Sequence, residues 1–258
     1  MRQPRPRMSR PGGGASVQVT GVNASYRTLW RRKAVLHDVS LSIDPGRLVA
    51  VVGPNGAGKT TLFTVLMGFH RADGGRCDID GMQPAAYRRT RGIGYGAEES
   101  RLPRGWTVRQ FLRRAVDLSP TAVDGEREYR RAIARTRLER EALSQPLSSC
   151  SKGTRRRIAF AWAGVGDPEL YVLDEPFSGL DPASRAYLRE ELQQLRDSGR
   201  TVLMASHEVA EVGRLADVAL IIHGGRLRPA EYAGSDSQAL AVALEAELLR
   251  AEASDDGR

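Results

Sequence analysis

The fold of this chain is decided by one stretch, Gly53-Pro54-Asn55-Gly56-Ala57-Gly58-Lys59-Thr60-Thr61. It matches the Gly-x-x-x-x-Gly-Lys-Ser/Thr pattern of phosphate-binding loops. The glycines let backbone N–H groups turn inward around phosphate oxygens, and the start of the following helix adds its positive dipole end. We expect Lys59 to neutralise the β- and γ-phosphates of a nucleotide, and the Thr60 hydroxyl to ligate Mg²⁺.

The residues on both sides of this loop fit the pattern. Leu48–Val52 is a short, wholly apolar run, which is typical of a strand buried on both faces. After the loop, apolar residues recur at helical spacing. A glycine-rich turn that precedes Lys-Thr by chance would lack this context, so the stretch is interpreted as a P-loop.

A second motif follows another apolar run, Leu170–Leu173. Asp174 and Glu175 come directly after it, at the strand end where α/β sheets bind their ligands. Alone, this pattern fits a solvated carboxylate equally well. Together with the P-loop it predicts that Asp174 holds the hydration shell of Mg²⁺ and that Glu175 polarises the water that attacks the γ-phosphate.

The remaining periodicity gives the fold class. We expect strands of an antiparallel sheet at Val17–Val22, Ala34–Leu36 and Val39–Ile43, and buried strands at Val202–Ala205 and Val218–Ile222. Leu188, Leu192 and Leu195 recur at helical spacing between strands, which indicates parallel strands with crossover helices. The sequence therefore predicts an α/β protein: a P-loop NTPase core with a mainly parallel sheet, an antiparallel β subdomain and an inserted helical subdomain.

Composition is that of an ordinary globular protein with a basic balance. The 258 residues are 41% apolar and 27% charged, with a formal net charge of +8. Solvated basic faces with a disordered arm explain this charge, and attraction to an acidic cytoplasmic membrane surface is the alternative. Cys77 and Cys150 are too far apart in sequence for a metal or redox motif, which suggests reduced cytosolic thiols. No secretory signal or membrane-spanning stretch is expected.

The residues after Glu175 distinguish among P-loop proteins. Glu175-Pro-Phe-Ser-Gly-Leu-Asp181-Pro182 closely resembles the Walker B and D-loop run of ABC ATPases. His207, which follows the strand Val202–Ala205, resembles the switch histidine of that family. The resemblance spans about residues 17–228, and it implies that Glu175, His207 and Lys59 are catalytic.

Another motif, Cys150-Ser-Lys-Gly-Thr154, resembles the family signature, usually Leu-Ser-Gly-Gly-Gln. Ser151 and Gly153 match it, whereas the other three positions depart. In the family this element faces the ATP of a second subunit, so the resemblance implies that Ser151, Gly153 and Asp181 contact nucleotide across a head-to-tail dimer. A degenerate loop that makes no such contact is the alternative.

Two further positions follow from the resemblance. Tyr26 occupies the place of the aromatic residue that stacks on adenine. Glu98 stands in the Q-loop, where most members have glutamine, and it is implied as a metal ligand. Exporters of the ABC-2 type often combine glutamate here with a later Thr-Val-Arg, which is Thr107–Arg109 in this sequence.

The resemblance implies an ATP- and Mg²⁺-dependent ATPase that drives a separate transmembrane permease, with exporter character. Its second ATPase subunit is either the same chain or a related one, its location is the cytoplasmic face of the membrane, and no nucleic-acid partner is expected. An ABC-type ATPase acting on ribosomes or DNA is the alternative, and the intact Glu175 and His207 oppose a non-hydrolysing regulatory subunit. We expect a disordered basic leader at 1–15, the ATPase domain at 16–230 with its helical subdomain at about 99–167, and a C-terminal helix and tail at 231–258.

Overall fold

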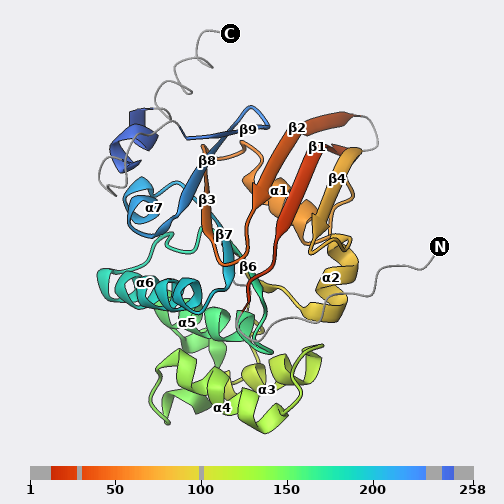
Figure 1. Cartoon of the computed structure of the whole chain (residues 1–258). Coiled ribbons are helices and arrows are strands. Elements are labelled where there is room, and N and C mark those ends of the chain that lie inside the picture. The colour runs from red at the N-terminus through yellow and green to blue at the C-terminus, as the bar shows by residue number, and fades with distance from the viewer. Residues whose placement is uncertain (1–12, 28–30, 99–101, 231–239, 247–258) are drawn as a thin grey trace, which may run out of the picture.

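The computed structural model describes residues 13–27, 31–98, 102–230 and 240–246. Its strands form two sheets, with helices around them (Figure 1). The larger sheet has the order β5-β6-β7-β3-β8-β9, and the smaller one has the order β2-β1-β4. The strands are β1 Val17–Arg27, β2 Arg32–Ile43, β3 Leu48–Val52, β4 Gly74–Ile79, β5 Gly94–Gly96, β6 Leu170–Asp174, β7 Thr201–Ser206, β8 Val218–His223 and β9 Arg226–Pro229. The helices are α1 Lys59–Leu66, α2 Pro84–Arg91, α3 Val108–Leu118, α4 Gly125–Thr136, α5 Lys152–Ala163, α6 Pro182–Asp197 and α7 Val209–Leu215, with short 3₁₀ turns at Ala142–Ser144 and Leu147–Ser149.

The larger sheet is the parallel core that the sequence predicts. β3 pairs in parallel with β7 and β8, and β6 pairs in parallel with β5 and β7. Only β9 runs antiparallel, beside β8. Because parallel strands end at one edge, the loops after β3, β6 and β7 meet there. These loops carry the P-loop, the acidic pair Asp174–Glu175 and His207.

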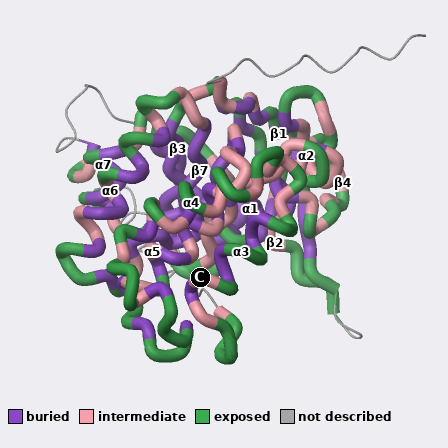
Figure 2. The backbone as a smooth tube through the Cα atoms, turned by 90° about the horizontal axis from the view of Figure 1, so that it is seen from below, coloured by how far each residue is buried: buried purple, intermediate pink, exposed green. Residues whose placement is uncertain are grey.

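The central strand β3 is buried on both faces, as its apolar run indicates. Val49 and Val51 pack into the apolar cluster that contains Leu62 and Phe63 of α1. Leu48, Ala50 and Val52 pack into the opposite cluster with α6 and α7. Figure 2 shows buried residues concentrated along β3 and β7, with exposed residues at the periphery. The expected stripe Leu188, Leu192 and Leu195 lies buried on α6.

The antiparallel sheet is present, but its strands differ from the expected segments. Ala34–Leu36 and Val39–Ile43 are parts of one strand, β2, which continues through Asp38 at a φ of 53°. β4 is a third strand that the periodicity does not predict. It pairs with β1, and its residues are mostly half-buried or exposed. β2 lies at the edge of this sheet, so one of its sides has no hydrogen-bonded partner strand. Such a strand can accommodate a local irregularity like the one at Asp38.

The helices α3, α4 and α5 form a separate apolar cluster with the 3₁₀ turns between them, below the sheets in Figure 1. The run Thr107–Arg109 marks the start of α3. The Thr107 hydroxyl accepts from the backbone N–H of Gln110, whose side chain reaches back to the Thr107 N–H. This capping box accounts for Thr107 and Gln110 at the start of α3.

Both ends of the described chain are packed against the core. Ala15 is fully buried, and its carbonyl accepts a hydrogen bond from the Thr201 hydroxyl at 2.7 Å. Ordered chain therefore begins before residue 16, the expected start of the ATPase domain, while residues 1–12 lie outside the described part. Leu240 and Leu244 of the expected C-terminal helix are buried, and Leu248 lies outside the described residues.

Candidate active site

The P-loop connects β3 to α1 with open backbone donors. Gly58 precedes α1 at a φ of 112°, and no side chain caps this helix. A Cβ on Gly53 would lie 2.2 Å from the Ile222 carbonyl oxygen, so only glycine fits there. The first N–H groups of α1 thus have no side-chain acceptor, which is the arrangement that binds phosphate at helix N-termini.

Lys59, the first residue of α1, is almost fully buried. Its ammonium donates to the carbonyl oxygens of Gly53 at 2.7 Å and Pro54 at 3.3 Å. The same Nζ lies 3.2 Å from Oε1 of Glu175, where it forms an ion pair. Lys59 is therefore held at the loop by groups that a nucleotide phosphate can partly replace.

Thr60 and Asp174 lie together at the ends of their elements. The Thr60 hydroxyl donates to Oδ2 of Asp174 at 2.7 Å. Burial raises the pKa of the Asp174 carboxyl, the nearby carboxylates of Glu175 and Glu98 raise it further, and the Thr60 hydrogen bond lowers it. The charge of Lys59 also lowers this pKa, and a cation held at the Thr60 hydroxyl would supply further compensating charge.

Glu175 is held through both its backbone and its side chain. Its backbone has a φ of 45°, its N–H donates to the Ala205 carbonyl at 3.0 Å, and its side chain is buried. Oε2 accepts from the backbone N–H of His207 at 3.2 Å and lies 2.8 Å from the His207 ring Nδ1. The carboxylate is therefore fixed between the Lys59 ammonium and the His207 ring.

These residues line a cleft of about 300 Å³. The sequence-predicted members that line it are Asn55, Gly56, Gly58, Lys59, Thr60, Thr61, Glu98, Asp174 and Glu175. His207 reaches the cleft through Glu175, and Tyr26 reaches it through its hydroxyl, 3.5 Å from the Thr61 hydroxyl. The Tyr26 ring is part-exposed and lies 4.8 Å from the ring of His70. His70 is not among the sequence-predicted site residues.

Ser151, Gly153 and Asp181 form a second group outside this cleft. Ser151 is exposed and caps α5 by accepting from the Thr154 N–H at 3.1 Å. Asp181 caps α6 by accepting from the N–H and the hydroxyl of Ser184, both at 2.9 Å. A Cβ on Gly153 would lie 2.2 Å from the Ser184 hydroxyl. The structure therefore brings the first turn of α5, with Gly153, beside the first turn of α6, which Asp181 caps.

Arg156 is a site residue that the sequence analysis missed, because Arg155–Arg157 reads as a basic surface cluster. Its side chain is buried and donates to the carbonyls of Ala97 at 2.7 Å, Glu98 at 2.9 Å and Glu175 at 3.4 Å. Burial lowers the pKa of Arg156. The signal was present in the helical period, since Gly153 and Phe160 share this buried face of α5.

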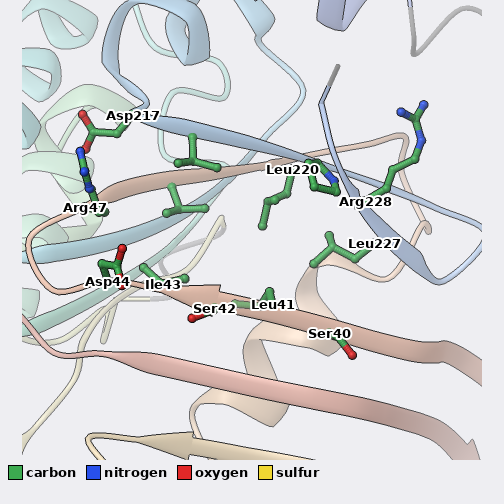
Figure 3. A pocket seen from close by; sticks show the side chains of 13 residues that line it. Ser40, Leu41, Ser42, Ile43, Asp44, Arg47, Asp217, Leu220, Leu227 and Arg228 are labelled. Atoms are coloured by element: carbon green, nitrogen blue, oxygen red, sulfur yellow. The ribbon is translucent and has the colours of Figure 1, made fainter. Parts of the chain in front are cut away.

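A larger hollow of about 410 Å³ lies between β2 and the β8–β9 hairpin. Figure 3 shows Arg47 and Asp217 at one end of it and Arg228 toward the other, with Leu41, Ile43 and Leu220 between them. None of the sequence-predicted site residues lines this hollow. We therefore assign the site to the smaller cleft, where the chemistry is concentrated.

The loop, the buried lysine and the strand-end carboxylates define a P-loop nucleoside triphosphatase. Comparisons with known proteins identify its family. The family described as "ABC transporter" matches residues 36–178. The chain is 35% identical to an uncharacterized ABC transporter ATP-binding protein from Rhizobium meliloti (strain 1021), over 80% of this chain and 77% of the relative. It is 34% identical to the lipopolysaccharide export system ATP-binding protein LptB from Escherichia coli (strain K12), over 77% of this chain and 84% of LptB.

Solved structures agree with this family. One described as the ATP binding subunit of an ABC transporter has a TM-score of 0.76 and 29% identity, covering 90% of this chain and 99% of that chain. A dimeric bacterial ABC transporter cassette has a TM-score of 0.75 at 22% identity, covering 84% of this chain and 99% of that chain, which supports the fold alone. The chain belongs to the ABC transporter family, as an ATP-binding and ATP-hydrolysing subunit.

Proposed function

We propose that this subunit binds ATP and Mg²⁺ between two ATPase domains and drives a separate membrane permease. One observation carries the proposal: the Glu175 carboxylate is fixed between Lys59 and His207 at the cleft. A second observation supports the dimer. Ser151, Gly153 and Asp181 lie outside the cleft of their own chain, and Ser151 and Asp181 are exposed, where the nucleotide of a partner can reach them.

Each residue has a role that follows from its chemistry. Lys59 neutralises the β- and γ-phosphates, Glu175 orients and polarises the attacking water, and His207 holds Glu175 in place. Catalysis of this kind depends on positioning and electrostatics rather than on covalent chemistry. The nucleotide-binding residues are Tyr26, Gly53, Pro54, Asn55, Gly56, Ala57, Gly58, Lys59, Thr60 and Thr61, with Ser151, Gly153 and Asp181 of the partner.

Thr60, Asp174 and Glu98 are the residues proposed to hold Mg²⁺. Among the described residues, no three His, Cys, Asp or Glu side chains gather to hold a metal by themselves. That fits Mg²⁺, which usually takes one or two carboxylates and completes its octahedron with water and substrate phosphates. Once bound, Mg²⁺ neutralises charge on the transferring phosphate.

The proposal that the permease is an exporter rests on more specific similarities than the family assignment. Glu98 and the run Thr107–Arg109 resemble ABC-2 type exporters, and the relative LptB serves an export system by its name. No described helix is long and apolar enough to cross a membrane. We propose a location on the cytoplasmic membrane face through a permease, with no nucleic-acid partner. Copurification with a membrane protein encoded beside this chain would support this assembly, whereas copurification with ribosomes would favour the alternative.

Mixing Ser151→Arg with wild-type chain tests whether the site is shared. The arginine places a large cation where a partner's phosphates are expected, and it also removes a helix cap worth about 1 kcal/mol. The ATPase rate of the mixture should fall below the rate that its wild-type share alone supplies. Ser149→Arg, which adds the same charge at an exposed residue of the same loop, should have no such effect. A rate proportional to the wild-type share would argue against a shared site.

Glu98→Gln tests the metal side of the cleft. The glutamate charge is attracted by Mg²⁺ but repelled by the γ-phosphate, so without metal only the repulsion remains. The variant should bind ATP more tightly than wild type in EDTA, by roughly 1 kcal/mol for a partly screened charge pair, and the difference should shrink in Mg²⁺. Titration of a fluorescent ATP analogue in both buffers measures this. If Glu98→Gln changed the affinity for ATP equally with and without Mg²⁺, Glu98 would not be a metal ligand.

A further inference from the structure

Arg185 joins two loops that the proposed mechanism treats separately. It lies on α6, just after the loop that leads from Glu175 to Asp181. Its Nε donates to the Leu180 carbonyl at 3.1 Å. Its two terminal nitrogens donate to the two carboxylate oxygens of Glu208, with Nη2 to Oε1 at 2.9 Å and Nη1 to Oε2. One planar guanidinium therefore holds a backbone carbonyl and a carboxylate together, a geometry that lysine cannot reproduce.

Glu208 is the residue directly after His207. Its own N–H donates to the Ser206 hydroxyl at 3.0 Å. His207 in turn meets Oε2 of Glu175 through its backbone N–H and its ring Nδ1. The His207 side chain is 51% exposed, so packing alone holds the ring weakly. Its position depends on the backbone on either side, which the Arg185–Glu208 pair fixes on one side.

These contacts close a ring through the site. From Glu175 the chain runs to Leu180, Arg185 links Leu180 to Glu208, and His207 returns to the Glu175 carboxylate. A closed ring of this kind reduces the freedom of each member, since displacing one requires breaking a charge-assisted hydrogen bond elsewhere.

We propose that Arg185 is a positioning residue, which holds Glu208 so that His207 meets Glu175. The proposal rests on the proposed function, in which Glu175 and His207 act on the nucleotide. Arg185 itself acts through Glu208 and the Leu180 carbonyl, and it contacts neither Glu175 nor His207 directly in the structure. It couples the loop that carries Asp181 to the loop that carries the switch histidine.

The chain offers a matched control one helical turn further along α6. Arg189 donates to both oxygens of Glu211, at 3.1 and 3.4 Å. The side chains of Arg185 and Arg189 are almost equally exposed, at 29% and 28%. The Arg189–Glu211 pair joins α6 to α7 and touches neither the Leu180 carbonyl nor the residue after His207, although Arg185 also lies 4.0 Å from Glu211. Any general effect of weakening an α6–α7 ion pair should therefore appear in both lysine variants.

The test compares Arg185→Lys with Arg189→Lys by NMR of ring-labelled histidines in the nucleotide-free protein. The sequence has four histidines, so His207→Ala identifies the His207 signals. In wild type, a hydrogen bond from Nδ1–H to the Glu175 carboxylate should hold one tautomer. Arg185→Lys should shift the His207 ring signals toward those of a free imidazole, whereas Arg189→Lys should leave them in place.

Kinetics supply the second readout. Arg185→Lys should lower kcat roughly tenfold, as for a slightly misplaced catalytic group, with KM for ATP nearly unchanged. Glu208→Gln should move the same His207 signals, and it keeps the test decisive if Arg185→Lys folds poorly. Unmoved His207 signals in these variants, or equal shifts in Arg189→Lys, would overturn the proposal. If Arg185→Lys moves the His207 signals but the wild-type chain hydrolyses no ATP, the link from Arg185 to His207 stands and the proposed function is overturned.

Discussion

Replacing Glu175 with glutamine should slow ATP hydrolysis by at least about 100-fold, as expected for loss of a general base, while ATP still binds. Glutamine keeps the shape of the side chain but removes the basic carboxylate. The Lys59 ammonium loses its ion-pair partner but keeps the carbonyls of Gly53 and Pro54. The His207 ring can still donate to the amide oxygen. The substitution therefore removes the chemistry with little change to the phosphate site.

The measurement is steady-state ATPase activity beside titration of a fluorescent ATP analogue. Glu190→Gln is the control, because it makes the same chemical change at a carboxylate that is 56% exposed and paired with Arg137. That control should turn over like wild type. If Glu175→Gln hydrolysed ATP at the wild-type rate, Glu175 would not be the general base. Loss of ATP binding would show that the substitution damages the site itself.

Lys59→Ala should abolish hydrolysis and weaken ATP binding. A charged hydrogen-bond donor is worth about 1.5–3 kcal/mol, so affinity should fall by roughly 10- to 100-fold. The physical reason is the loss of the only ammonium that lines the described cleft. The phosphates would then face Glu98, Asp174 and Glu175 with less opposing charge.

The same change also leaves the buried Glu175 carboxylate without its cation, which is destabilising. Lys59→Arg separates the two effects, because it keeps a positive charge beside Glu175 but places a larger, planar group in the loop. We expect Lys59→Arg to melt near the wild-type temperature and still to hydrolyse ATP poorly. Normal turnover in a folded Lys59→Ala chain would contradict the P-loop assignment.

Local sequence patterns predicted the part of the fold that surrounds the nucleotide. β3, α1 and β6 are all set by apolar runs that end at glycine or acidic residues, so their positions follow from sequence alone. β4 and β5 were not predicted. β5 is three residues long with two glycines, and β4 has few apolar residues, so both owe their conformation to pairing with β6 and β1.

The functional site, like the fold, was only partly predictable from the sequence. Short, contiguous motifs made it possible to predict the roles of Lys59, Thr60, Asp174 and Glu175. The roles of Arg156 and Arg185 were not, since helical spacing can place an arginine on a buried face but does not show which distant carbonyls its guanidinium reaches. The ion pair between Lys59 and Glu175 likewise depends on the side-by-side placement of β3, β7 and β6.

The central claim is that two such chains enclose ATP, with the Ser151 loop of one facing the P-loop of the other. Light scattering of the Glu175→Gln chain during size-exclusion chromatography, with and without ATP, tests it most directly. A variant that binds ATP without hydrolysing it should elute with the mass of a dimer in ATP and of a monomer without nucleotide, and Ser151→Arg added to the same chain should prevent the dimer. A Glu175→Gln chain that binds ATP yet stays monomeric at every protein concentration would contradict the account.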